Sequence, residues 1–288
     1  MSVAVVTDST SYLPRGWARR EGILVVPVQV IIGGHAFDET DDDQAEQVAE
    51  ALRSWQPVTT SRPSPVRFTD AFETAVAAGA SQVAVVTLSS AMSATHESAV
   101  LAAREFAAKV DVIDSRTIAM GLGFAALEGA RAATGGADLE TVVDAISARA
   151  SASSTYFYVD TLEYLRRGGR VGTAKAAVAQ ALQVKPILHV LEGRVVQLDQ
   201  VRTAGKALAR LAQLAAADAR ASLDAGTPVD IAVQHLAAPE RASALADDLR
   251  TQLPDCPLVE CEVGGVVGAH VGPGMVAVVV SPAAGGRS

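Results

Sequence analysis

The sequence is poor in aromatic side chains and in cysteine. Aromatic residues make up 4% of its 288 residues, and only two cysteines are present. Hydrophobic residues still account for 49% of the chain, so alanine, valine and leucine must build the core. A chain of this length is sufficient for two domains of ordinary size or one large one.

The two cysteines do not form a recognisable pair. Cys256 and Cys261 lie in the segment PDCPLVECEV, and an odd offset places them on opposite faces of a strand. We therefore expect neither a disulfide nor a metal site here, but buried thiols in a reducing compartment. A cytoplasmic location is the corresponding expectation.

The chain also lacks an excess of positive charge. Its formal net charge is -8, whereas nucleic-acid-binding proteins usually carry a basic surface. We expect no nucleic-acid partner.

Long hydrophobic runs are missing as well. The start, MSVAVVTDSTS, has no positively charged region before an apolar core, so we expect no signal peptide. Val263 to Gly286 carries no charge, but glycines and the turn Gly272-Pro273-Gly274 leave only MVAVVV as a continuous apolar run. That run is far shorter than the ~20 residues that span a bilayer.

Several motifs of catalysis and metal binding are absent. The chain contains neither the G-x-S-x-G elbow of many hydrolases nor the G-x-x-x-x-G-K-[ST] loop of P-loop enzymes. GLGFAA (Gly121 to Ala126) does not follow a strand directly, which favours a helix face of small residues. DETDDD (Asp38 to Asp43) lacks the spacing of a calcium loop and is typical of a solvated loop. We expect no metal and no cofactor.

Short β-branched runs alternate with alanine-rich helical stretches, which indicates an α/β protein. In the first half, the pattern predicts a mainly parallel sheet from strands at Val3–Val6, Ile23–Val30, Val83–Val86 and Val110–Ile113. Helices are predicted over Asp43–Ser54, Pro65–Ala77, Ser93–Ala108, Thr117–Ala133 and Leu139–Ala150.

The second half predicts a different arrangement. YFYV is followed by two helical stretches on either side of RRGGRVG, and then by VKPILHVL and VVQLDQV, a hairpin closed by Glu192-Gly193-Arg194. Further strands and helices after Thr203 predict a mixed sheet with helices on one face. We place the linker in SASSTY and divide the chain into domains 1–153 and 154–288.

Hydroxyl and carboxyl side chains gather where the predicted strands end. They occur in VAVVTDSTS, VAVVTLSS and VDVIDSRT, and again in TTSRPSP. Ligands of open parallel sheets bind at the carboxyl ends of strands, and the following helices favour an anion there. Each cluster alone could simply cap a helix. Together they favour a site for an anionic group.

Seven segments together resemble one known family. VTDSTSYLP, TSRPSP, TLSSAMSATHESA, VIDSRT, TLEYLRRGGRV, VKPIL and GAHVGPG occur in the order and at about the separations found in the DegV family of bacterial fatty-acid-binding proteins. The resemblance covers nearly the whole chain, from Val3 to about Val280.

The resemblance implies two α/β domains that hold one long-chain fatty acid between them. By analogy, Thr60, Ser61 and Ser93 bind its carboxylate beside His270, and Ser90 and Thr95 are further candidates. The chain departs from the usual family pattern at Arg62, Ala94 and His96, where glutamine, glycine and tyrosine are common.

Some family members present the fatty acid to a separate kinase, which forms an acyl phosphate for lipid synthesis. The resemblance therefore implies a non-catalytic carrier with a fatty acid kinase as partner, and leaves room for transient contact with a membrane surface. Arg170 and Arg202 are our candidates for docking the kinase. Two alternatives remain: an enzyme acting on a small phosphorylated or carbonyl substrate at the same cleft, and a lipid-sensing regulator.

Overall fold

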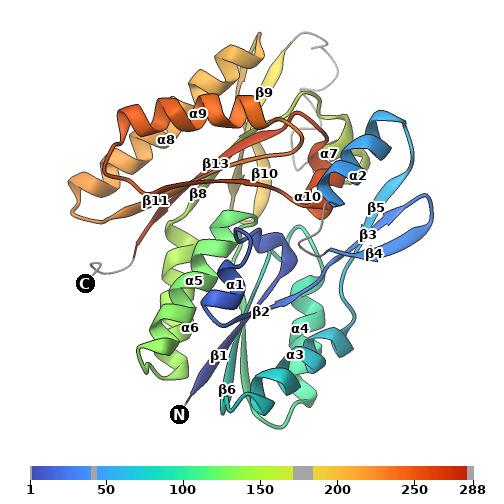
Figure 1. The fold of residues 1–288 in the computed structure, drawn as a ribbon, viewed down its shortest axis with the longest axis vertical. Coiled ribbons are helices and arrows are strands. Elements are labelled where there is room, and N and C mark those ends of the chain that lie inside the picture. The colour runs from blue at the N-terminus through green and yellow to red at the C-terminus, as the bar shows by residue number, and fades with distance from the viewer. Residues whose placement is uncertain (1, 40–43, 171–183, 284–288) are drawn as a thin grey trace.

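The computed structural model describes residues 2–39, 44–170 and 184–283. Within them lie a four-stranded sheet, a six-stranded sheet and a small three-stranded sheet. Figure 1 shows the four-stranded sheet in the lower half of the molecule, the six-stranded sheet above it, and the small sheet at one side. This confirms the expected α/β class, with one parallel and one mixed sheet.

The four-stranded sheet is entirely parallel, with the order β2-β1-β6-β7. Its strands are β1 (Val3–Asp8), β2 (Ile23–Val26), β6 (Gln82–Thr87) and β7 (Lys109–Asp114). The central strands are valine-rich and buried, as is typical of parallel strands covered on both faces. The polar ends of β1, β6 and β7 therefore lie together at one edge, as the sequence predicts.

Helices cover both faces of this sheet. Phe68, Phe72 and Ala75 form the buried stripe of α3 at helical spacing, and they pack in one core cluster with α4. On the other face of the sheet, α5 and α6 pack in a second core cluster. Their bounds are α3 (Pro65–Ala77), α4 (Thr95–Glu105), α5 (Met120–Thr134) and α6 (Leu139–Ala152). The segment GLGFAA lies in the first part of α5 and is buried on all sides, rather than on one face as the sequence predicts.

The run Ile23–Val30 is two strands and not one, which corrects the sequence prediction. β2 ends at Val26, and β3 (Gln29–Ile32) starts a separate antiparallel sheet with the order β4-β3-β5. Pro27 lies at the break, and proline cannot donate a hydrogen bond within a sheet. The partners of β3 are β4 (His35–Asp38) and β5 (Val58–Ser61), and α2 (Gln44–Arg53) lies between them in sequence.

The six-stranded sheet has the order β10-β9-β8-β13-β11-β12. Only β11 and β12 pair in parallel, so the sheet is mixed. Its strands are β8 (Ser154–Tyr158), β9 (Lys185–Leu191), β10 (Arg194–Val201), β11 (Val229–His235), β12 (Leu258–Glu262) and β13 (Val276–Pro282). The predicted hairpin at Glu192-Gly193 joins β9 to β10.

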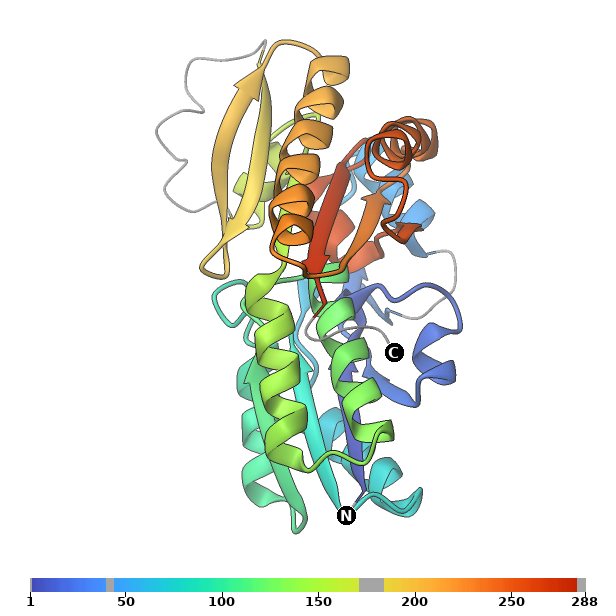
Figure 2. The same ribbon diagram turned by 90° about the vertical axis from the view of Figure 1, so that its left-hand side faces the viewer.

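Two long helices cover one face of this sheet, and Figures 1 and 2 show both on the same side. They are α8 (Ala204–Asp224) and α9 (Pro239–Gln252). Buried alanines along α8 allow close packing on the strands. The opposite face packs partly against α5, because Ala232 and Val279 belong to the core cluster of that helix.

The remaining helices are short. They are the 3-10 turn η1 (Ser9–Ser11), α1 (Trp17–Arg20), α7 (Glu163–Arg167) and α10 (Gly265–Val271). α7 is the first of the helical stretches predicted beside RRGGRVG; the second falls in 171–183, outside the described residues. None of the helices in the described ranges has both the length and the apolar composition needed to cross a membrane.

The prediction that SASSTY forms a linker is wrong, because α6 continues to Ala152 and β8 begins at Ser154, which leaves one residue between them. The division of the chain near residue 153 stays a prediction.

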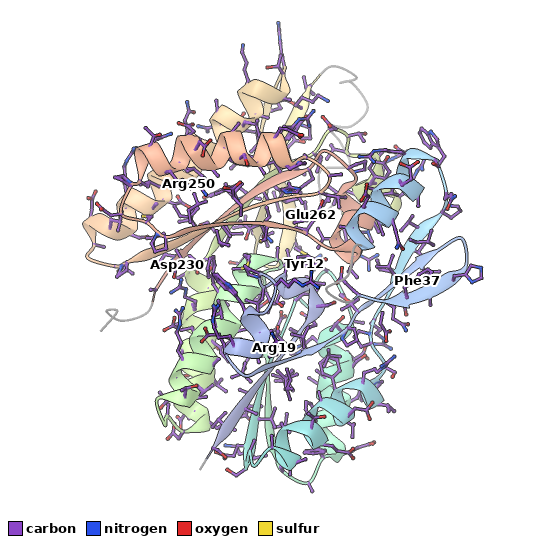
Figure 3. All side chains as sticks on the ribbon, in the orientation of Figure 1. Tyr12, Arg19, Phe37, Asp230, Arg250 and Glu262 are labelled. Atoms are coloured by element: carbon purple, nitrogen blue, oxygen red, sulfur yellow. The ribbon has the colours of Figure 1, made fainter. Side chains whose placement is uncertain are left out.

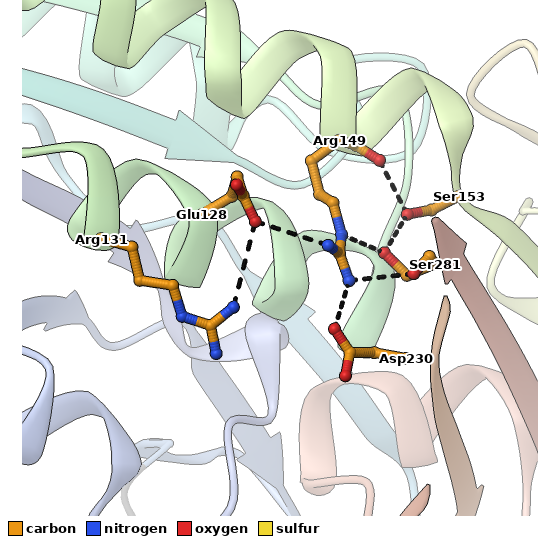
Figure 4. A network of polar contacts seen from close by, with 6 residues as sticks. All are labelled: Glu128, Arg131, Arg149, Ser153, Asp230 and Ser281. Carbon is orange, nitrogen blue, oxygen red and sulfur yellow. Dashed lines mark hydrogen bonds and ion pairs between the residues drawn. The ribbon is translucent and has the colours of Figure 1, made fainter. Parts of the chain in front are cut away.

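Arg149 ties α6 to the six-stranded sheet. Its side chain is 1% exposed and donates to Ser281 Oγ of β13 and Asp230 Oδ2 of β11, each at 2.7 Å. Figure 4 shows Arg149 reaching from α6 between Glu128 of α5 and these two residues. Removing one partner of a buried ion pair leaves the other charge buried and unpaired, which strongly destabilises a fold. This contact therefore holds α5 and α6 in a fixed position against the six-stranded sheet.

Candidate functional site

A cavity of about 230 Å³ lies between the two larger sheets. Most of its lining is aliphatic or aromatic, and the lining residues come from both halves of the chain, among them Leu88, Ile118, Phe157, Val190, Val195 and Met275. An apolar cavity with a few polar groups at one point is typical of a small-molecule site.

Polar side chains mark the mouth of the cavity. Arg62, Ala94 and Arg170 line it and are exposed, whereas Leu88 and Phe157 are buried. Four of the residues predicted to bind the ligand, Thr60, Ser61, Ser93 and His270, also line the cavity. The structure therefore brings these four together, although they lie 210 positions apart at the extremes.

Thr60 and His270 form a contact between β5 and α10. Thr60 Oγ1 lies 3.0 Å from His270 Nε2. Burial and the nearby Arg170 cation lower the pKa of His270 to about 4, so the ring is neutral at pH 7. Nδ1 is buried and has no hydrogen-bond partner among the described residues. With Nε2 protonated, the ring donates to Thr60, whose own hydroxyl proton is then free for an anion.

Ser93 and Thr95 form a similar pair at the start of α4. Their hydroxyl oxygens are 2.8 Å apart, and the Thr95 amide donates to Ser93 Oγ over 3.2 Å. Thr95 is fully buried, and it lies behind Ser93 rather than in the cavity lining. Thr95 can therefore donate to Ser93 and leave the Ser93 proton free to point into the cavity.

Most other hydroxyls of the run Thr87–Ser98 serve contacts within the protein. Ser89 Oγ donates to the Gly193 carbonyl over 2.7 Å, and Thr87 Oγ1 lies 3.3 Å from His96 Nδ1. Ser90 is exposed, donates to Asp114, and is not one of the described residues that line the cavity. Of this run, Ser93 alone contributes a hydroxyl to the described lining.

Two arginines lie at the mouth. Arg62 Nη1 pairs with Glu97 Oε2 at 2.5 Å. Arg170 Nε donates to the Met92 carbonyl over 3.1 Å, and Nη1 donates to the Gly168 carbonyl over 2.6 Å. Arg170 therefore lies across the mouth of the cavity. The sequence predicts it only as a docking residue, and docking does not require a residue to line the cavity. Arg202 is exposed just after β10 and is not part of the described lining.

Glu39 and Tyr12 hold the helix that carries His270, and the sequence reasoning missed both. Glu39 accepts from the Val266 amide at 2.8 Å, and the Tyr12 hydroxyl accepts from the Val267 amide at 3.0 Å. Tyr12 in turn donates to Glu39 over 3.1 Å. Figure 3 shows Tyr12 in the middle of the molecule. Both amides belong to the first turn of α10, where no partner within the helix is available.

Glu39 is 5% exposed, which corrects the prediction that Asp38–Asp43 is a solvated loop; residues 40–43 lie outside the described ranges. Burial raises the pKa of Glu39 to about 7, against hydrogen bonds from Ser9, Val266 and Tyr12. Burial also raises the pKa of Asp8 to about 6. Asp8 accepts from the Leu88 amide at 2.8 Å and so fixes the end of β6 beside the cavity.

Ala119 is a strained point of the lining. Its φ of 60° and ψ of -144° are rarely adopted by residues other than glycine. The following amide, Met120, donates to the buried Gln234 side chain of β11 over 3.0 Å. This bond to the second sheet holds the start of α5 against the cavity.

Comparisons with known proteins agree with this architecture. The family described as "Uncharacterised protein, DegV family" matches residues 2–283. A DegV domain-containing protein of Streptomyces coelicolor is 49% identical over 280 residues, which are 97% of this chain and 98% of the relative.

Solved structures show the same fold. A fatty-acid-binding DegV family protein from Thermus thermophilus has a TM-score of 0.89 and 29% identity, over 98% of this chain and 100% of that one. DegV of Bacillus subtilis, described as a fatty acid binding protein, has a TM-score of 0.87 and 29% identity, over 98% and 99% of the two chains. Because the family match covers nearly its whole length, this chain belongs to the DegV family.

Proposed function

We propose that this protein is a non-catalytic carrier of one long-chain fatty acid. The apolar cavity with hydroxyl groups at its mouth is the observation that carries the proposal. Burying a methylene group stabilises by roughly 0.8 kcal/mol, so ~14 of them supply on the order of 11 kcal/mol before the costs of binding. The tail therefore dominates the affinity, and the mouth must provide partners for the carboxylate.

Thr60, Ser61 and Ser93 supply these partners in our proposal. Ser93 accepts a hydrogen bond from the Thr95 amide, and Thr60 accepts one from His270 when Nε2 carries the ring proton, so the hydroxyl protons of both can be donated to a carboxylate. Hydrogen bonds to an ionised acceptor are stronger than neutral ones. Arg170 adds a positive charge at the mouth, which favours the ionised form of the acid. The neutral His270 orients Thr60.

A carrier must also release its cargo to an acceptor. The exposed mouth leaves the carboxylate end of the ligand nearest to solvent, which is the end that a kinase would phosphorylate. The presentation of the fatty acid to a fatty acid kinase is therefore part of our proposal, and Arg202 remains our candidate for docking.

The direct test is the lipid content of the purified protein. We expect organic extraction of the denatured protein, followed by mass spectrometry, to recover about one long-chain fatty acid per chain. Ala277→Phe fills the cavity from β13 and should abolish this content. Val66→Phe is the control: it makes the same kind of change at a position of α3 that is 64% exposed, and this variant should retain the fatty acid. No fatty acid in the wild type, even after incubation with fatty acids, would refute the proposal.

A further inference from the structure

Gly168 lies directly against the imidazole ring of His270. It follows the last residue of α7, and a Cβ built on it would lie 2.2 Å from His270 Nδ1 and 2.9 Å from Cε1. Any larger residue would therefore push the ring out of its present position. The same two segments meet again at Gly272, where a Cβ would lie 2.1 Å from Cδ2 of Tyr164 in α7. The end of α10 is thus packed tightly against α7.

This packing leaves His270 Nδ1 without a hydrogen-bond partner. The atom is buried and has no partner among the described residues. The amide of Gly168 donates to the Tyr164 carbonyl over 2.9 Å, so it is not free for the ring. The carbonyl of Gly168 accepts from Arg170 Nη1 over 2.6 Å. Nδ1 therefore faces Gly168, with a cation beside that glycine and no access to solvent.

The two ring nitrogens of His270 are in different surroundings, and this decides which of them carries the proton. Burial and the Arg170 cation lower the pKa of His270 to about 4, so at pH 7 one nitrogen has a proton and the other a lone pair. A proton on Nδ1 would form a buried N–H group without an acceptor, which is costly. A proton on Nε2 can be donated to Thr60 Oγ1 over 3.0 Å.

We propose that Gly168 is a positioning residue of the carboxylate site, because its packing against Nδ1 fixes His270 in the tautomer with the proton on Nε2. His270 then donates to Thr60, and the hydroxyl proton of Thr60 is left for the carboxylate of the ligand. In the other tautomer Thr60 would donate to Nε2 and turn only lone pairs toward the carboxylate. The proposal rests on the fatty-acid carrier function and adds the residue that sets the direction of this hydrogen bond.

The tautomer can be observed directly. Two-bond proton–nitrogen correlation spectra of protein labelled with nitrogen-15 histidine distinguish a protonated ring nitrogen from an unprotonated one. The signals of His270 are identified by their absence in His270→Gln. We expect the proton on Nε2 in the delipidated wild type at pH 7 and in the same protein saturated with palmitic acid. A proton on Nδ1 in either state would overturn the proposal.

Gly168→Ala tests the role of the glycine. Its methyl group should displace the ring, so that the spectrum of His270 changes and palmitic acid binds about tenfold more weakly. Gly205→Ala is the matched control, because a Cβ built on Gly205 of α8 has open space around it, and it should keep both the spectrum and the affinity. An unchanged affinity or an unchanged spectrum in Gly168→Ala would overturn the role of Gly168.

A second variant separates this effect from a general loss of structure. If Gly168→Ala does not fold, Gly168→Ala combined with His270→Ala should fold, because the ring that the methyl group meets is gone. Failure of both variants to fold would place the clash elsewhere and overturn the role of Gly168. Failure of the wild type to bind palmitic acid or any other long-chain fatty acid would instead refute the carrier function itself.

Discussion

Single hydroxyl groups do different work in this protein according to what stands behind them. Thr60 is backed by His270, and Ser93 is backed by Thr95. In each pair the second residue can donate a hydrogen bond, which leaves the proton of the cavity-facing hydroxyl free for an anion. Ser90, in the same run of sequence, is bonded to Asp114 instead. Hydroxyl residues that look alike in the sequence therefore have two different roles: some face the ligand, and others hold the protein together.

We predict that Ser93→Ala and Thr60→Val each weaken fatty-acid binding by about 1–3 kcal/mol, because each removes one hydrogen-bond donor from the carboxylate of the ligand. The measurement is a binding titration with the delipidated protein. Ser90→Ala removes a hydroxyl from the same segment but outside the cavity lining, and it should bind as the wild type does. Unchanged affinity in both cavity variants would place the carboxylate elsewhere.

The spacing of hydroxyl clusters identifies which residues can gather at one edge, but not which of them face the ligand. The parallel order of β1, β6 and β7 brings the clusters together, and this follows from the sequence pattern. Glu39 could not be recognised in the same way. It precedes a run of acidic residues typical of a solvated loop, whereas its partners Tyr12 and Val266 are far away in the sequence.

At the scale of elements, α10 is the part of the site most dependent on distant residues. It is only seven residues long, too short to be stable by itself. Its first amides are bonded to Glu39 and Tyr12, and its last turn carries His270. A substitution of Glu39 should therefore shift α10 and, with it, the contact between His270 and Thr60.

The charge of Glu39 should make stability depend on pH. Its pKa is about 7 in the folded protein, against an ordinary value of 4.5. Between these values the folded state binds more protons than the unfolded state, so the contribution of Glu39 to the free energy of unfolding falls as the pH rises. Because burial lowers the pKa of His270, its contribution to the free energy of unfolding rises with pH between about pH 4 and pH 6.5.

We predict that Glu39→Gln removes this pH-dependent loss. From pH 5 to pH 8, the wild type should lose about 2–3 kcal/mol of unfolding free energy relative to the variant. Denaturant titrations of both proteins over this range provide the measurement, and taking the difference between them removes the contribution of His270. A difference that stays constant with pH would show that Glu39 remains ionised in the folded protein.

The sequence predicts long and strongly periodic elements better than short ones. The valine-rich strands and the alanine-rich helices were expected because their burial is visible in one segment. The small sheet was not, since β4 and β5 are four residues long and partly exposed, and since their pairing with β3 is decided by contacts with α2 and α10. Pro27 was the one local signal that the run Ile23–Val30 must break.

At the scale of the whole molecule, the cavity exists only because the two larger sheets are held together. Arg149 fixes one side of the contact. On another side, the tip of the β9–β10 hairpin reaches the first half (Figure 2): Ser89 donates to the Gly193 carbonyl, and Arg116 pairs with Glu192. Val190 and Val195 of this hairpin line the cavity, so movement of the hairpin would open the tail end.

The surface around the mouth must also meet the acceptor of the fatty acid. Because Arg170 spans the mouth and lines the cavity, Arg170→Glu should impair ligand binding itself and cannot test docking. Arg202 lies outside the described lining. We predict that Arg202→Glu binds fatty acids as the wild type does but slows acyl-phosphate formation with the cognate kinase, and that raising the salt concentration narrows this difference.

Arg104→Glu is the control for the change in net charge. Arg104 is exposed in the last turn of α4, at the end of that helix away from Ser93, and its reversal should leave kinase turnover unchanged. Turnover is measured at low and moderate salt, alongside a binding titration of each variant. Full turnover with Arg202→Glu would remove this residue from the docking surface, whereas a parallel loss of binding and turnover would assign it to the cavity or the fold. Equal slowing by Arg104→Glu would mean that net charge, rather than a docking site at Arg202, governs the encounter.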